Sequence, residues 1–95
     1  VDVLMDGAMY NAGQCCCGIE RIYVHRSRFD AFVDRATAWV SQLRLGSPLD
    51  PATTLGPMAN IRFATEVRAQ VAEAVAAGAS PLIGREAFPQ DDGGT

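Results

Sequence analysis

The sequence has no long apolar run, no cluster of basic residues and no phosphate-binding glycine motif. No stretch approaches the roughly 20 consecutive apolar residues that a membrane-spanning helix needs, so we expect no membrane segment. Basic residues neither gather nor alternate with aromatics, and the formal net charge is −3, so nucleic acid is not an expected partner. Neither G-x-G-x-x-G nor G-K-[ST] occurs, so the chain offers no nucleotide site of its own.

Histidine is also scarce, and the usual zinc-binding spacings are missing. His25 is the only histidine, and no two cysteines have the C-x-x-C spacing. We therefore predict no metal-binding residue. The chain is 48% apolar and 20% charged, which is ordinary for a globular protein, and 95 residues allow one small domain at most.

The three cysteines, Cys15, Cys16 and Cys17, are consecutive and lie between Gly13 and Gly18. Three thiols cannot all pair within one chain, and adjacent cysteines close a disulfide only with strain. We therefore expect a reducing compartment, the cytoplasm. Spacing alone leaves three interpretations open: buried inert thiols, a nucleophile, or metal ligands. The last is the weakest, because consecutive side chains are expected to point apart.

The pattern of apolar residues predicts helices and strands in alternation. The expected elements are a helix over residues 1 to about 11, a strand over Ile19–His25, a helix opened by Ser27 with Asp30 as its cap partner, a helix over Asn60–Ala77 stopped by Gly78, and a short strand at residues 81–83. A proline-containing loop over residues 46–57 joins the two longer helices. We expect an α/β fold in which helices pack on a largely parallel sheet.

The stretch from Met9 to His25, MYNAGQCCCGIERIYVH, resembles the nucleophile segment of the NAD(P)-dependent aldehyde dehydrogenases. That family's motif is Gly-Gln-x-Cys, which Gly13, Gln14 and Cys16 match. The resemblance continues in order along most of the chain, at Arg21, Val24, Phe29, Phe32, Val33, Gly46, Pro48, Gly56, Pro57 and residues 77–79.

The resemblance implies roles for particular residues. Cys16 would be the catalytic nucleophile, and Tyr10, Cys15 and Cys17 would line the substrate pocket. A small aldehyde would be oxidised to a carboxylic acid through a thiohemiacetal and a thioester, with NAD or NADP as the electron acceptor.

The resemblance also implies what lies elsewhere. The family's cofactor domain, general-base glutamate, oxyanion-binding asparagine and oligomerisation hairpin have no counterpart in this sequence. We therefore expect residues 1–95 to be part of a catalytic domain, with no cofactor-binding residue of its own and inactive alone. The start at Val1 without methionine agrees with this expectation. The full-length enzyme would be a homo-oligomer.

Other functions stay open. The chain could be a small thiol-based metal or redox module, an interaction module that kept the fold without the chemistry, or a segment of a CoA-acylating aldehyde dehydrogenase. A dyad of His25 with Cys16 is disfavoured, because an extended strand between them would span about 30 Å. We expect His25 to be a surface or capping residue.

Overall fold

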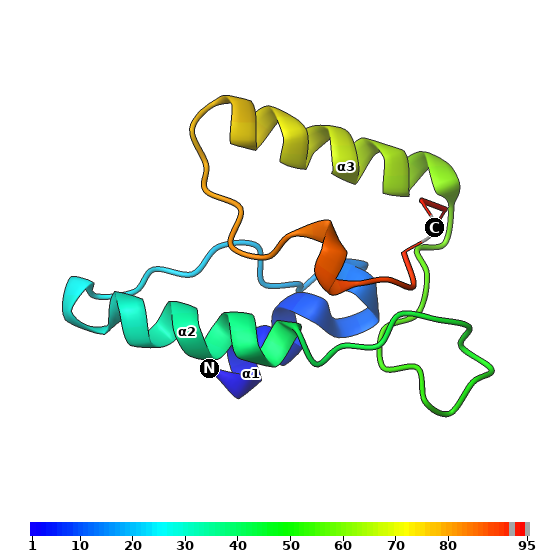
Figure 1. The fold of residues 1–95 in the computed structure, drawn as a ribbon, viewed down its shortest axis with the longest axis horizontal. Helices are drawn as coiled ribbons and strands as arrows, with labels where there is room; N and C mark the ends of the chain where they lie inside the picture. Colours follow the sequence, from blue (N-terminus) through cyan, green and yellow to red (C-terminus); the bar gives the residue numbers. More distant parts are fainter. Residues whose placement is uncertain (92, 95) are drawn as a thin grey trace.

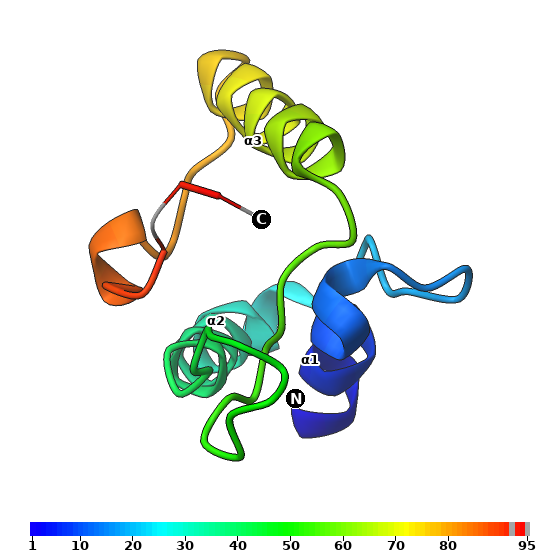
Figure 2. The same ribbon diagram turned by 90° about the vertical axis from the view of Figure 1, so that its right-hand side faces the viewer.

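The computed structural model describes residues 1–91 and 93–94, and its regular elements are helices. In chain order they are α1 (Asp2–Met9), η1 (Tyr10–Gly13), η2 (Arg26–Arg28), α2 (Phe29–Val40), α3 (Ile61–Ala76) and η3 (Arg85–Ala87), where η marks a 3-10 helix. Figure 1 shows α1 beside α2, with α3 on the opposite side of the molecule, and Figure 2 shows the same separation from a second direction.

The packing of α1 on α2 forms the small core beside the cysteines. Met5 of α1 is buried, with 6% of its surface exposed. After the cysteines, the chain returns to α1, where the N–H of Ile19 donates to the carbonyl of Gly7 at 3.2 Å. A Cβ on Gly7 would lie 2.8 Å from Cδ1 of Ile19, so glycine allows the two segments to approach closely.

The third helix begins and ends where its local sequence predicts. The side chain of Asn60 accepts the N–H of Arg62 at 2.8 Å and caps the N-terminus. At the other end, Gly78 has a φ of 106°, its N–H donates to Val75, and the N–H of Ala79 donates to Ala74. This is the Schellman arrangement, so the predicted stop at Gly78 is confirmed.

The apolar face of α3 is largely uncovered. Five large apolar side chains on this helix are at least two-fifths exposed, namely Ile61, Phe63, Val67, Val71 and Val75. Only Ala64 of α3 is buried. The whole chain exposes 7309 Å², whereas a compact monomer of this size exposes about 5,300 Å². The chain therefore leaves apolar surface open that a self-contained domain of this length would bury.

The predicted α/β fold is wrong for this structure. No residue among 1–91 and 93–94 belongs to a β-strand, and the one isolated bridge joins Leu45 to Leu55. Residues 19–25 have a β-favouring composition but form no strand. The other predicted strand, at residues 81–83, forms a bend. A strand is stable only when a neighbour accepts its backbone hydrogen bonds, and neither segment supplies one to the other.

The loop between α2 and α3 folds back on itself. The N–H of Arg44 donates to Thr54 Oγ1 at 2.8 Å, and the N–H groups of Thr54 and Leu55 both donate to the Arg44 carbonyl. These contacts close the loop before the chain enters α3. Within the part of the chain that the structure describes, none of the helices has the length and apolar character required to cross a membrane.

Candidate functional site

The segment before the cysteines has an unusual backbone. Asn11, Ala12 and Gly13 have φ values of 51°, 56° and 76°, so three successive residues are left-handed. Asparagine and glycine tolerate this conformation, but an alanine there costs roughly 1–2 kcal/mol. The chain thus leaves the axis of α1 abruptly, and the cysteines follow on a loop rather than on a continued helix.

Gln14 holds this loop in place through both ends of its amide. Its Nε2 donates to the Asn11 carbonyl at 2.9 Å, and its Oε1 accepts the N–H of Ala59 at 2.8 Å. The Asn11 side chain reciprocates, since its Nδ2 donates to the Gln14 carbonyl at 3.2 Å. Gln14 therefore connects the start of the cysteine loop to the segment that leads into α3.

The cysteines themselves form a tight turn. The N–H of Gly18 donates to the Cys15 carbonyl at 3.0 Å, which places Cys16 and Cys17 at the two central positions of a β-turn. Cys16 and Cys17 are exposed, Cys15 is half-buried, and all three thiols are free. A Cβ on Gly18 would lie 3.2 Å from the Cys15 carbonyl oxygen, so a larger residue there would crowd the turn.

The three sulfur atoms lie close together, although they belong to consecutive residues. Each Sγ is within 4.8 Å of the other two, and Cys15 Sγ is 3.2 Å from Cys17 Sγ. This differs from the expectation that neighbouring side chains would point apart. The β-turn accounts for the difference, because it curls the backbone around the thiols.

The turn shifts the pKa values of Cys15 and Cys17 in opposite directions. The backbone N–H of Cys17, and then its thiol, donate to the Cys15 sulfur, and this lowers the pKa of Cys15. Donating to Cys15, and lying beside its negative charge, raises the pKa of Cys17. The turn therefore favours ionisation of Cys15, which lies directly beside the predicted nucleophile, over ionisation of Cys17.

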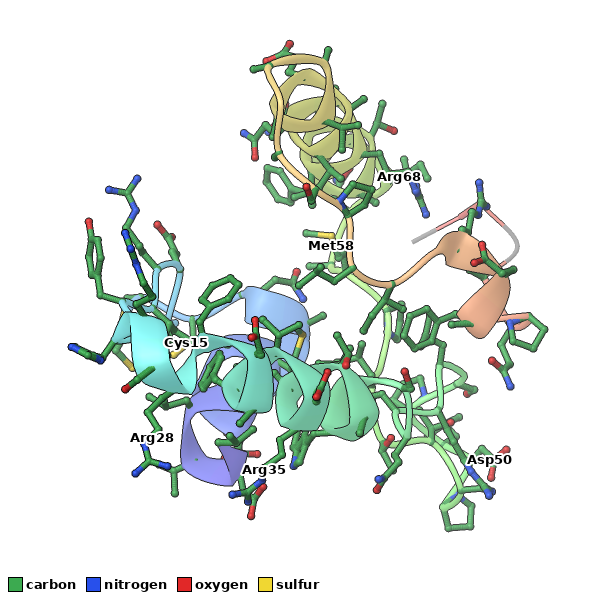
Figure 3. All side chains as sticks on the ribbon, turned by 60° about the vertical axis from the view of Figure 1, so that its left-hand side comes forward. Cys15, Arg28, Arg35, Asp50, Met58 and Arg68 are labelled. Atoms are coloured by element: carbon green, nitrogen blue, oxygen red, sulfur yellow. The ribbon has the colours of Figure 1, made fainter. Side chains whose placement is uncertain are left out.

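A cleft of about 660 Å³ opens near the cysteines but does not include them. Its walls come from the end of α1 and η1, the loop between α2 and α3, α3 itself and the C-terminal segment. Among its lining residues are Met9, Ala12, Leu55, Met58, Arg68 and Asp91. Figure 3 accordingly shows Cys15 well separated from the cleft residues Met58 and Arg68.

The predicted pocket residue Tyr10 is 64% exposed, and it lines neither this cleft nor the smaller one between α2 and residues 80–83. Cys15 and Cys17 line neither cleft as well. The structure therefore brings Cys15, Cys16 and Cys17 together, while Tyr10 lies apart from the cavities. The assignment of these residues to a substrate pocket stays a prediction.

His25 is a capping residue, as the sequence suggested. Its Nδ1 accepts the N–H of Ser27 at 3.3 Å and lies 2.9 Å from Ser27 Oγ, at the start of η2. The predicted pairing of Ser27 with Asp30 is replaced by this contact. The imidazole is exposed and is not part of the sulfur cluster.

The sequence did not reveal what Gln14 does in space. Its partner Ala59 is 45 positions away and belongs to a segment with no polar motif. The only available signal was the place of Gln14 in the Gly-Gln-x-Cys motif. That signal marks the residue without indicating that its amide connects the cysteine loop to the entry of α3.

The Cys16 thiol is exposed at the centre of a tight turn, and hydrogen bonds to Asn11 and Ala59 hold the residue before that turn, so the thiol is accessible to a reacting partner. The model of the aldehyde dehydrogenase family matches residues 1–95, and the chain belongs to that family.

Individual relatives agree with this family assignment. A succinate-semialdehyde dehydrogenase [NADP(+)] 1 of Mycobacterium tuberculosis is 42% identical over 79 residues, covering 83% of this chain and 17% of the relative. A succinate-semialdehyde dehydrogenase [NADP(+)] of Mycolicibacterium paratuberculosis is 40% identical over 84 residues, covering 88% of this chain and 18% of the relative. The chain thus spans less than a fifth of the length of these relatives.

Proposed function

We propose that this chain is the nucleophile segment of an aldehyde dehydrogenase and that Cys16 is its catalytic nucleophile. The observation that carries the proposal is the exposed Cys16 thiol at the centre of the turn that follows Gln14, at the cysteine of the family motif. Residues 1–95 would then be part of a catalytic domain. The uncovered apolar face of α3 supports this, because such a face is stable when another part of a larger domain packs on it.

The chemistry assigned to Cys16 is addition to a carbonyl. The Cys16 thiolate attacks the aldehyde carbon, a carbon–sulfur bond forms, and the carbonyl π-electron pair moves to oxygen to give the oxyanion of a thiohemiacetal. The backbone N–H and the thiol of Cys17 donate to the Cys15 sulfur and lower the pKa of Cys15, the neighbour of the reacting residue. Activation of Cys16 and stabilisation of the oxyanion are therefore assigned to groups beyond the described residues, such as the general base that the family resemblance implies.

The described residues do not fit a nicotinamide cofactor. A dinucleotide site needs a strand, a glycine-rich turn and a helix N-terminus that together receive the pyrophosphate. Residues 1–91 and 93–94 contain no strand, and neither of the two clefts has a glycine-rich turn leading from a strand into a helix. We propose that NAD or NADP is bound by other parts of a longer protein, and we assign this chain no step that involves it. The two relatives are named as NADP(+) enzymes, which favours NADP.

We propose a small semialdehyde as the substrate, on the strength of those relatives' names. We further propose that the full-length enzyme is a homo-oligomer and that it is located in the cytoplasm. Three free thiols are compatible with a reducing compartment. Transfer of the acyl group to CoA instead of water is the alternative within the same chemistry.

The test uses the longer protein that contains this chain. Cys16→Ser should abolish aldehyde oxidation, whereas Cys15→Ser and Cys17→Ser should retain it. Mapping of iodoacetamide adducts should find Cys16 alkylated first. Dominant alkylation of Cys15 or Cys17, or full activity of Cys16→Ser, would overturn the assignment. The 95-residue chain alone should neither bind nucleotide nor oxidise aldehydes.

A further inference from the structure

The sulfur atoms of the cysteine turn are close enough to share one cation. A thiolate–zinc bond is about 2.3 Å long, which places two sulfur ligands about 3.8 Å apart in a tetrahedral site. In a planar three-coordinate site with bonds of the same length, the separation is about 4.0 Å. Cys15 Sγ lies 3.2 Å from Cys17 Sγ, and none of the three sulfur–sulfur separations exceeds 4.8 Å. The separations that the two geometries require lie between these two values.

The backbone that brings the sulfur atoms together is itself restrained. The Gly18 N–H closes the turn on the Cys15 carbonyl, and the Cys15 N–H donates to the Gly13 carbonyl at 3.0 Å. Gln14, immediately before the turn, is tied to Asn11 and Ala59. A cation would therefore meet a turn whose backbone is already folded around the three thiols, rather than a free coil.

The ligand set determines which cations fit. Among the described residues the cluster contains only thiols, with no imidazole or carboxylate within the same radius. Thiolate sulfur selects soft cations, whereas carboxylate and carbonyl oxygen select magnesium and calcium. Cys16 and Cys17 are exposed, so one side of the cluster is open to solvent.

We propose that Cys15, Cys16 and Cys17 form a three-sulfur site for a soft cation of the zinc, cadmium and copper(I) class, with water completing the coordination where a fourth ligand is needed. Binding releases the three thiol protons to solvent and forms three metal–sulfur bonds, with no change of oxidation state. The proposal depends only on the sulfur positions and is independent of the aldehyde chemistry. Where that chemistry operates, the cation would occupy the Cys16 electron pair that attacks the carbonyl, so cation and aldehyde would exclude one another.

The experiment titrates the fully reduced protein with Cd²⁺, in a buffer free of thiols and chelators. We expect one Cd²⁺ per chain by elemental analysis, together with the ultraviolet charge-transfer band of cadmium–thiolate bonds. Cys15→Ser, Cys16→Ser and Cys17→Ser should each weaken binding by roughly tenfold or more, by analogy with losses known at metal sites. His25→Ala, which removes the only histidine, is the control and should leave the affinity unchanged.

Several results would overturn the site. They are an unchanged affinity in any one of the three serine variants, a stoichiometry of one cation per two chains, or a loss of binding in His25→Ala. Circular dichroism of each variant checks that the helices are retained, and Cys15→Ala, Cys16→Ala and Cys17→Ala repeat the test without a hydroxyl. Because the readout is cation stoichiometry and not turnover, failure of this site and failure of the proposed enzyme function are separate outcomes.

Discussion

Gln14 Oε1 accepts the backbone N–H of Ala59 at 2.8 Å, across 45 positions of sequence. Through this contact the loop that presents the cysteines is connected to the residue next to Asn60, the N-cap of α3. The same amide donates to Asn11 on the other side. The Gln14 side chain therefore contacts both the segment that presents the thiols and the segment that leads into α3.

Replacing Gln14 by alanine should loosen the cysteine loop. The variant loses one hydrogen bond to Ala59 and one to Asn11, each worth about 1 kcal/mol net, so we expect a loss of about 1–2 kcal/mol. Urea unfolding followed by circular dichroism would measure it. Gln70→Ala is the matched control, since Gln70 is exposed on α3 and the change should stay within about 0.5 kcal/mol. Equal effects of the two substitutions would contradict the role given to Gln14.

Ala12 should respond favourably to glycine. Its φ of 56° costs an alanine roughly 1–2 kcal/mol, and the greater freedom of glycine in the unfolded chain returns about 0.5–1 kcal/mol of that. Ala12→Gly should therefore stabilise the protein by up to about 1.5 kcal/mol, and Ala12→Val should destabilise it. The control is Ala38→Gly in α2, where the backbone is helical and the same change should cost about 0.5–1 kcal/mol. Thermal unfolding that gave both glycine variants the same sign would disprove the assignment of strain to Ala12.

The sequence predicted well those features that depend on neighbouring residues. The helix predicted over Asn60–Ala77 is α3, Ile61–Ala76, so its bounds were predicted to within a residue at each end, and the predicted stop at Gly78 is confirmed. The start of α2 was less accurate, because His25 and not Asp30 is the side chain that pairs with Ser27. Both residues are local candidates, and the choice between them depends on backbone geometry.

Features that depend on distant segments were not predictable in the same way. The β-favouring composition of residues 19–25 says nothing about a partner strand, and the structure provides none within the described chain. The convergence of Cys15 and Cys17 likewise follows from a turn closed by Gly18, which residue spacing alone does not specify. The motif identified the cysteines, but the contact of Gln14 with Ala59 needed the fold.

Because the apolar face of α3 is exposed in this chain, Val71→Asp should affect the stability of the 95-residue chain and of the longer protein differently. Val71 is 57% exposed, so Val71→Asp should change the stability of the 95-residue chain by no more than about 0.5 kcal/mol. If a larger catalytic domain covers this face, the same substitution buries a charge there and should cost several kcal/mol. Chemical unfolding of both proteins compares the two costs. Ala64→Asp, at a buried position, should destabilise both, and an equal effect of Val71→Asp in the two proteins would refute the proposed covering of α3.

The attachment of the C-terminal segment to α3 should depend on pH through Asp91. Its carboxylate lies 2.9 Å from Arg85 Nε and 3.4 Å from Arg68 Nη2. The N–H of Gly93 donates to it at 2.9 Å, and that hydrogen bond, followed by the charges of Arg85 and Arg68, lowers the pKa of Asp91. A carboxyl with a lowered pKa in the folded state contributes its full stabilisation above its unfolded pKa of about 3.9. That contribution is lost as the pH falls through the lower, folded value.

We therefore expect the contact between Arg68 and Asp91 to persist at pH 5 and to weaken only below pH ~3.9. Nuclear magnetic resonance of the Asp91 carboxyl carbon and the Arg68 side chain should show a shared midpoint below that value. Asp91→Asn should remove the pH dependence of the Arg68 signal. Asp34→Asn is the control, because among the described residues the Asp34 carboxylate forms no ion pair, and it should leave that signal unchanged. A midpoint for Asp91 above its ordinary pKa would mean that the two arginines and Gly93 do not hold the carboxylate in solution.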